Sequence, residues 1–119
     1  MKQEDQHIRP VKSFVIDEGK WSCARDSRSD QTLLSKNGSK CCLGFLALAC
    51  GATTKEIADE GDLSRLGLSN FGLNGRVHDR AIAINDDWEM PFETKKEKLT
   101  ELFKKRGIVV KFVDRKKGR

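Results

Sequence analysis

The distribution of apolar positions along the chain predicts two helices of different character. Residues 43–50 are apolar on nearly every side, which is typical of a helix that is buried all round, and Gly51 is expected to end it. Gly44 and Ala47 are small and lie about one turn apart, so this helix allows another segment to approach closely. Residues 91–106 carry apolar side chains along one face, which predicts an amphipathic helix packed on the core.

A third helix is predicted near the N-terminus. Pro10 suits the first turn of a helix, and Val11, Phe14 and Val15 have the i, i+3, i+4 spacing of one buried face. Gly19 is placed to end this helix, because glycine is favoured just beyond a helix C-terminus.

The middle of the chain predicts shorter helical segments. Thr53 offers a hydroxyl cap to a short helix that begins at the next residue. Residues 61–75 mix Gly, Asn and Ser with spaced Leu, which predicts short helical turns beneath an irregular loop, and residues 77–84 fit a further helix. The Asn85-Asp86-Asp87 run that follows is interpreted as a tight connection whose side chains satisfy backbone groups. A metal or acid–base role for it lacks a second carboxylate cluster.

Two segments predict β-structure. Residues 108–113 are rich in β-branched side chains, which favours a strand. The segment 31–42 contains Asn37-Gly38, the dipeptide most typical of a two-residue hairpin turn. We therefore expect a small antiparallel sheet in which the C-terminal strand pairs with the first strand of this hairpin, residues 32–35.

Length and composition confine these elements to one domain. A chain of 119 residues, 37% hydrophobic and 34% charged, has the size and composition of a single folded unit. We predict an α+β domain over residues 10–114, in which several short helices pack on the small antiparallel sheet. Residues 1–9 are expected to form a loose lead-in and residues 115–119 a basic tail.

Positive charge is concentrated toward the C-terminus. The formal net charge of the chain is +5, yet residues 95–119 contain eleven Lys and Arg against three Asp and Glu, a net charge of +8. Such a region attracts phosphate groups or an acidic protein surface. It is equally typical of a solvated helix face followed by a tail.

The cysteines predict structural thiols in a reducing compartment. Cys41, Cys42 and Cys50 lie in or beside one apolar run, where a thiol behaves as a small apolar side chain. The sequence has neither a C-x-x-C pair nor neighbouring histidines, so we expect no metal and no other cofactor. The apolar runs are shorter than a membrane span and no signal-peptide pattern opens the sequence, which predicts a cytoplasmic protein.

One arrangement of residues favours catalysis. Cys42 at the start of a helix, followed by His78 and Asn85, has the chain order of several cysteine hydrolases. In such enzymes a helix N-terminus and a histidine activate the thiol. The segment around His78 predicts a helix rather than the strand such an enzyme needs. A small cysteine hydrolase that uses Cys42 and His78 is therefore kept as an alternative, and no catalytic residue is assigned.

A nucleic-acid-binding regulator is the other alternative. The positive charge suits it, but the chain has no Tyr and its six Phe lie mostly at core spacing. Single-strand and RNA binders usually stack bases on exposed rings. The glycines at 67, 72 and 75 form neither a dinucleotide-binding motif nor a P-loop, although their loop can bend around a small anion beside Arg76 and Arg80.

Several short motifs follow one another in an order that suggests relatives. They are Gly19-Lys20-Trp21, Cys41-Cys42-Leu43-Gly44 before an apolar helix, Leu66-Gly67-Leu68, and Ala83-Ile84-Asn85-Asp86-Asp87 with Phe92 opening the last helix. Over roughly residues 10–105 the chain resembles a group of small bacteriophage and prophage proteins. Their pattern is a Gly-Lys-aromatic step, a Cys-Cys-Leu-Gly-hydrophobic motif, and a Leu-Asn-Asp turn before a closing helix. The resemblance implies a fold and a viral origin, and it supplies no catalytic residue. The C-terminal strand and the basic tail depart from the pattern.

We therefore predict a phage-encoded accessory protein that acts by stoichiometric binding and is not an enzyme. The expected partner is a host protein or a protein–nucleic-acid complex, and the expected effect is inhibition of a host defence system or of another host factor. A nucleotide signal or nucleic acid is the other class of partner considered. The residues expected to bind the partner or its phosphate groups are Arg76, Arg80, Lys104, Lys105, Arg106, Lys111, Arg115, Lys116 and Lys117.

Overall fold

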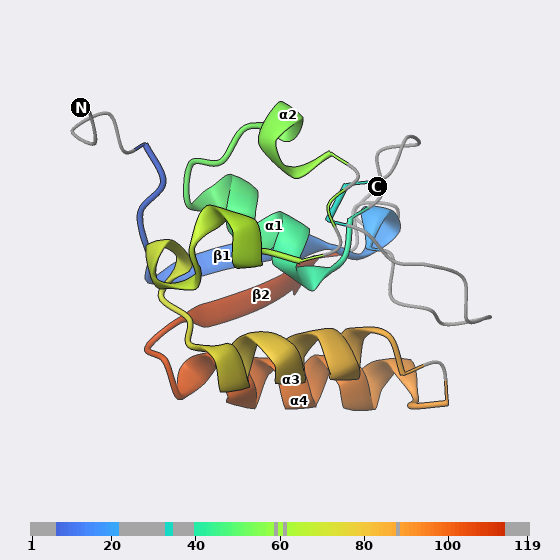
Figure 1. Ribbon diagram of the computed structural model, residues 1–119. Helices are drawn as coiled ribbons and strands as arrows, with labels where there is room; N and C mark the ends of the chain where they lie inside the picture. Colours follow the sequence, from blue (N-terminus) through green and yellow to red (C-terminus); the bar gives the residue numbers. More distant parts are fainter. Residues whose placement is uncertain are drawn as a thin grey trace.

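The computed structural model describes residues 7–21, 33–34, 40–58, 60, 62–87 and 89–113. Their elements follow in the order β1 (Ser13–Asp17), the 3₁₀ turn η2 (Glu18–Lys20), α1 (Cys42–Ala49), α2 (Thr54–Ile57), the 3₁₀ turns η3 (Ser64–Leu66) and η4 (Leu68–Phe71), α3 (Gly75–Asn85), α4 (Phe92–Lys104) and β2 (Val109–Val113). Figure 1 shows these elements gathered into one unit, so the α+β class predicted from the sequence is confirmed.

The two strands form a parallel sheet, so the antiparallel sheet predicted from the sequence is wrong. Phe14 of β1 lies opposite Val110 of β2, and Ile16 lies opposite Phe112. Strands that run in the same direction cannot be joined by a tight turn and need a long crossover connection. Here the crossover is the helical part of the chain, which brings the last strand beside the first (Figure 1).

The described residues of the segment 31–42, which are 33–34 and 40–42, do not pair with the C-terminal strand, contrary to expectation. β2 pairs with β1 instead. Leu34 and Lys40 each form an isolated parallel bridge, the first with Ala58 and the second with Trp21. The turn predicted within this segment lies outside the described residues.

The helix predicted after Pro10 is also wrong, because strand β1 occupies this position. Phe14 and Ile16 are buried, whereas Ser13 and Val15 are exposed, and this alternation is that of a strand with one covered face. The β-branched side chains of Val15 and Ile16 suit a strand better than a helix. The strand that pairs with β1 lies far away in the sequence, so the local spacing of apolar residues did not reveal it.

Helix α1 is buried over most of its surface rather than all round, because Phe45 and Leu48 are partly buried and Ala49 is exposed. A close approach to the helix is confirmed at Gly44. A Cβ atom added at Gly44 would clash with the backbone carbonyl of Leu33, so only glycine fits there. Gly51 follows the helix with φ +108°, in the region that favours glycine. Cys42 begins this helix, and Cys41 and Cys50 flank it; all three are buried and none of them forms a disulfide.

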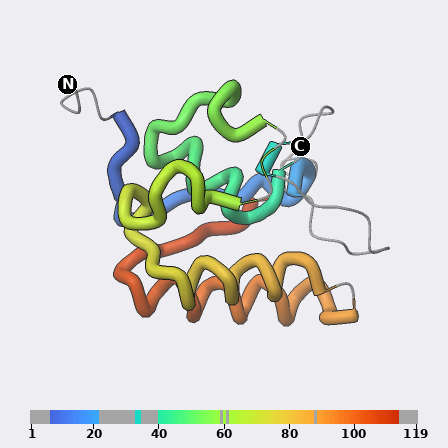
Figure 2. Tube along the Cα trace, viewed as in Figure 1, coloured from blue at the N-terminus to red at the C-terminus, as the bar shows by residue number. Residues whose placement is uncertain are grey.

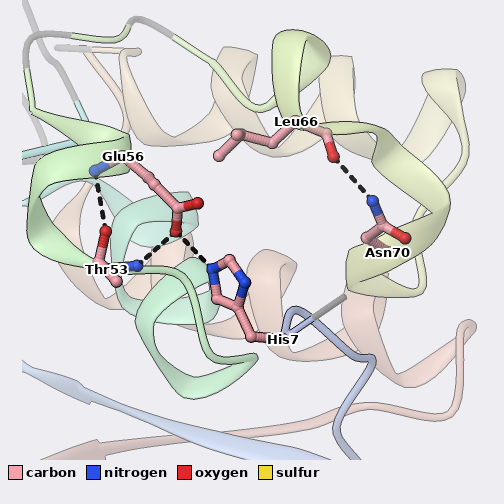
Figure 3. Close-up of polar contacts among 5 residues, drawn as sticks. All are labelled: His7, Thr53, Glu56, Leu66 and Asn70. Carbon is pink, nitrogen blue, oxygen red and sulfur yellow. Dashed lines mark hydrogen bonds and ion pairs between the residues drawn. The ribbon is translucent and has the colours of Figure 1, made fainter. Parts of the chain in front are cut away.

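Thr53 caps α2 as predicted, in the reciprocal arrangement drawn in Figure 3. Its hydroxyl accepts a hydrogen bond from the backbone N–H of Glu56 at 3.1 Å, and the Glu56 carboxylate accepts one from the backbone N–H of Thr53 at 2.8 Å. The same Glu56 oxygen lies 2.8 Å from Nε2 of His7, which links α2 to the N-terminal segment.

The described part of the predicted lead-in packs against the helical layer. Ile8 is buried, and the backbone N–H of Arg9 donates to the carbonyl of Cys50 at 2.8 Å. Residues 1–6 lie outside the described residues.

The remaining helical predictions are confirmed. The turns η3 and η4 lie within the described residues 62–75, and there the Asn70 side chain donates to the carbonyl of Leu66 at 2.8 Å (Figure 3). The helices predicted at 77–84 and 91–106 are α3 and α4, and Gly107 at φ +78° follows α4. Among the described residues no helix is both long and apolar enough to cross a membrane.

The helices cover one face of the sheet. The Phe14 ring meets the Phe103 ring of α4 edge-on at 5.3 Å, α1 packs on β1, and α3 packs on α4. Figures 1 and 2 show α3 and α4 side by side below the strands, with α1 above them. The opposite face carries Val15, Val109 and Val113, whose side chains are 45%, 50% and 36% exposed. Parallel sheets are usually covered on both faces, so this open face sets the fold apart.

Candidate functional site

A small depression lies between α3 and α4. Its volume is about 110 Å³. Helix α3 contributes Arg80 and Ile84, helix α4 contributes Lys98, Glu101 and Leu102, and the residue that follows α4, Lys105, completes the lining. We refer to this feature as the α3–α4 depression.

The amphipathic pattern of the two helices produces this lining. On α3, Val77 and Ala81 are buried, while Arg80 is exposed. On α4, Leu99 and Phe103 are buried. Residues 98, 101, 102 and 105 have the i, i+3, i+4, i+7 spacing of one helix face, so they form a strip beside the buried one.

The structure brings together some of the basic residues that the sequence analysis selected. Arg80 and Lys105 both line the α3–α4 depression. Arg76 lies one turn before Arg80 on α3, and Lys104 ends α4, and both are exposed. Lys111 lies elsewhere, on the open face of the sheet.

Arg106 has a structural contact. Its Nε donates a hydrogen bond to the backbone carbonyl of Gly72 at 3.0 Å, which ties the end of α4 to the turn after η4. Arg115, Lys116 and Lys117 lie outside the described residues.

Sequence analysis missed four members of the lining. Lys98 and Glu101 were counted only as part of the charged C-terminal region. Ile84 was named only within a motif at the end of the helix predicted over 77–84, and Leu102 belonged to the apolar face predicted over 91–106. The spacing of the charged residues along α4 was the signal that could have found Lys98, because it shares a helix face with Lys105. The contribution of α3 depends on tertiary packing and had no local signal.

The chemistry that this lining offers is reversible binding of an anionic group. Three cationic side chains and one carboxylate give the depression a net positive charge. Ile84 and Leu102 add apolar surface, and Ile84 is almost fully buried. A charged group with an adjoining apolar part fits such a mixture.

The Cys42 thiol of the alternative hydrolase is enclosed in the core. Cys42 is fully buried, and its Sγ lies 3.8 Å from the carbonyl oxygen of Ala81, to which it donates. Burial raises the pKa of the neighbouring thiols of Cys41 and Cys50 to about 11, so both are protonated at neutral pH. Buried thiols in apolar surroundings are poor nucleophiles.

His78 is occupied by structural hydrogen bonds. Its ring is 1% exposed, and Nε2 accepts a hydrogen bond from the backbone N–H of Leu63 at 3.1 Å. Since a backbone N–H can only donate, Nε2 bears the lone pair and Nδ1 bears the proton, which faces Asp79 Oδ1 at 3.0 Å. The ring therefore joins α3 to the segment before η3. A general base would need that lone pair for the Cys42 thiol.

Asn85, the third member of that trio, holds several segments together. Its Oδ1 accepts hydrogen bonds from Nε1 of Trp21 at 2.7 Å and from the backbone N–H of Cys42 at 3.0 Å. Its backbone carbonyl accepts one from Nζ of the fully buried Lys95 at 2.9 Å. The side chain of Asn85 satisfies a backbone group as predicted, although Asn85 is the last residue of α3 and not part of the connection that follows. Asp87, which accepts from the backbone N–H of Glu89 at 3.1 Å, contributes in the same way.

A second, wider depression of about 610 Å³ lies between α4 and β2. It is lined by Glu93, Lys96, Glu97, Thr100, Glu101 and Phe112. Nζ of Lys96 lies 2.8 Å from Glu18, and this hydrogen bond raises the pKa of Lys96. The same Nζ lies 5.3 Å from the ring centre of Phe92 and 5.6 Å from that of Phe112. Lys96, the only lysine among the described residues of this lining, is therefore engaged within the protein.

Within the part of the chain that the structure describes, no cluster of three or more His, Cys, Asp or Glu side chains is arranged to hold a metal ion. Comparisons with protein-family models, with curated proteins and with solved structures find no match to this chain. The function is therefore argued from the geometry.

Proposed function

We propose that the protein acts by reversible, stoichiometric binding to an acidic partner through the exposed basic side chains of α3 and α4. We call this set the α3–α4 basic surface, and it consists of Arg76, Arg80, Lys98, Lys104 and Lys105. The observation that supports the proposal is the convergence of Arg80, Lys98 and Lys105 on one depression that also has apolar lining. Protein interfaces combine an apolar centre with a polar rim in this way, and arginine is enriched in them.

Binding explains the side chains better than catalysis does. Cys42 is buried against the carbonyl of Ala81, and the His78 ring is held by Leu63 and Asp79. A hydrolase would require both groups to face a substrate. Replacing Cys42 by Ser should therefore leave the biological effect of the protein in place, although it will change stability.

The order of sequence motifs supports a phage origin for this binding protein. On that basis the partner would be a host protein or a protein–nucleic-acid complex in the host cytoplasm, and the effect would be to inhibit a defence system or to redirect another host factor. The acidic character of the partner follows from the charge of the α3–α4 basic surface.

Affinity purification with matched variants tests the proposal. The tagged protein is produced in cells of a phage host, and co-purifying molecules are identified and quantified. The test variant is Arg80→Ala/Lys105→Ala. The control is Lys12→Ala/Lys55→Ala, which removes the same charge from exposed positions on other parts of the molecule.

The proposal predicts a partner that is recovered in stoichiometric amount with the wild type and with the control, and that is lost with the test variant. Equal recovery with both double variants would show that binding does not use this surface, and the proposal would then be wrong.

A nucleic-acid-binding regulator is a second candidate, because of the net charge of +8 over residues 95–119. Binding to nucleic acid releases counterions, so affinity falls steeply as salt rises. A short duplex titrated at several salt concentrations would show this slope, and deletion of residues 115–119 would reduce it. Binding of a protein partner that changes little with salt would exclude this candidate.

A further inference from the structure

The α3–α4 depression has features of an anchor site for one chemical group. Ile84 and Leu102 provide its apolar lining, and Arg80, Lys98 and Lys105 provide the positive charge. We infer that it receives the carboxylate of a Glu or Asp side chain from an acidic segment of a protein partner. This inference rests on the proposed function and names the chemistry of the partner at that surface.

The volume of the depression limits the occupant to a single group. At about 110 Å³ it is small for a binding site. Sites for whole small molecules are about 300–1,000 Å³. The occupant is therefore one functional group that a larger molecule presents.

The chemistry of the lining fits a carboxylate joined to an aliphatic chain. The guanidinium of Arg80 matches a carboxylate with two parallel hydrogen bonds, while Lys98 and Lys105 add positive charge. The apolar surface of the partly buried Leu102, with a small contribution from Ile84, suits the methylene groups of the incoming side chain or an apolar neighbour in the partner sequence. A phosphate group would use the charges and leave this apolar surface without a counterpart.

Charge along α4 favours a protein over a nucleic acid as the source of that group. A continuous phosphate backbone requires a run of cations. Along α4 and the residue that follows it, Glu97 and Glu101 alternate with Lys98 and Lys105, and Glu101 is part of the lining itself. None of the described side chains that line the depression is an aromatic ring on which a base could stack. A partner whose acidic residues are spaced and separated by apolar residues complements this pattern.

Both helices hold the site in a fixed geometry. α3 and α4 pack on each other along their length (Figure 1), and Ile84 is nearly buried between them. Packed helices fix the backbone positions of the site, so binding has to order only the side chains of Arg80, Lys98 and Lys105.

Nuclear magnetic resonance titration of the full chain tests the inference. The probes are a short peptide of Glu and Leu residues, the same peptide with Gln in place of Glu, inorganic phosphate, and a short DNA duplex. We expect the Glu peptide to shift the backbone amide signals of residues 80–84 and 98–105. The Gln peptide should bind about tenfold more weakly or worse, since it lacks the charge.

Substitutions test whether each charged side chain strengthens or weakens binding of the Glu peptide. Arg80→Ala/Lys105→Ala should weaken binding of the Glu peptide by about tenfold or more, whereas the charge-matched Lys12→Ala/Lys55→Ala should change it less than about threefold. Glu101→Gln should strengthen binding, because it removes a carboxylate that repels the incoming one. The wild-type spectrum outside the depression serves as the check that each variant is folded.

Four outcomes would overturn the inference. They are tighter binding of the duplex than of the Glu peptide at the same amides, equal binding of inorganic phosphate, equal binding of the Gln peptide, and no shift with the Glu peptide at millimolar concentration. None of these outcomes contradicts the proposed function as long as the affinity purification still loses the partner with Arg80→Ala/Lys105→Ala. Retention of that partner would instead contradict the proposed function.

Discussion

The Asn85 side chain at the end of α3 accepts hydrogen bonds from two donors that lie far apart in the sequence. Trp21 follows β1, and the Cys42 backbone begins α1, yet both donate to the same buried oxygen. Both donors lie in the core, where a polar group without a partner destabilises the fold. A single amide therefore fixes how α3 meets the first strand and the first helix.

Replacing Asn85 by Ala should lower the free energy of unfolding by about 2–5 kcal/mol, since it leaves two buried donors without their acceptor. Asp87→Ala is the control, because its side chain accepts only a backbone N–H at an exposed turn, and it should cost less than about 1 kcal/mol. Urea unfolding measures both. Equal costs for the two variants would contradict the role given to Asn85.

Two glycines at helices offer a second matched test. Gly44→Ala places a Cβ against the carbonyl of Leu33 and should destabilise by about 3 kcal/mol or more. Gly75→Ala at the start of α3 meets no atom within 4 Å and should stabilise by up to about 1 kcal/mol, because alanine favours the helix. Thermal and urea unfolding report both changes. A tolerated Gly44→Ala would contradict the close contact between α1 and residue 33.

At the scale of elements, the helices from α1 onward and strand β2 were predictable, whereas strand β1 and the pairing of the two strands were not. Helices α1 and α4 were predicted from local features of the sequence, namely composition, capping residues and the spacing of apolar residues. Strand β1 has the same apolar residues that would suit a short helix. Only Val110 and its neighbours on β2, which are far away in sequence, decide between the two structures.

The hydrogen bonds at the start of α2 predict a dependence of stability on pH. The hydrogen bond to His7, followed by those to Thr53, holds the pKa of Glu56 below its ordinary value of 4.5. A carboxyl whose pKa is lower in the folded state adds stability above pH 4.5, and this contribution disappears as the pH falls through the folded-state pKa. Wild-type protein should therefore exceed Glu56→Gln in unfolding free energy at neutral pH, and the difference should shrink on acidification.

Urea unfolding of both proteins over a pH series gives that difference directly. Repeating the series in a His7→Ala background provides the control. In that background, the difference in unfolding free energy that Glu56→Gln causes should be smaller at neutral pH. If the difference in unfolding free energy between wild type and Glu56→Gln does not change with pH, the charge of Glu56 does not contribute to stability.

At the scale of the whole molecule, the candidate site was only half predictable. The excess of positive charge toward the C-terminus pointed to Lys105, and the loop analysis pointed to Arg80. Their meeting depends on how α3 packs against α4, which no local pattern encodes. Lys111 carries the same charge but is turned to the open face of the sheet.

The two-layer arrangement itself can be tested at neighbouring positions of β2. Val110 is 5% exposed and faces the helices, whereas Val109 is 50% exposed on the open face. Val110→Asp should destabilise by about 3 kcal/mol or more, because it buries a charge, and Val109→Asp should cost about 1 kcal/mol or less. Urea unfolding distinguishes them. The reverse order of costs would mean that the sheet presents its other face to the helices.

The parallel pairing of the first strand with the last has a consequence for synthesis of the protein. While the ribosome makes the chain, β1 emerges early, and its partner does not exist until residue 113 has been added. Translation adds about 5–20 residues per second, so Phe14 and Ile16 lack their contacts with β2 for a time on the order of 10 s. The nascent chain therefore cannot complete its core from the N-terminus onward. During that interval it is a substrate for chaperones and proteases that the finished protein would not be.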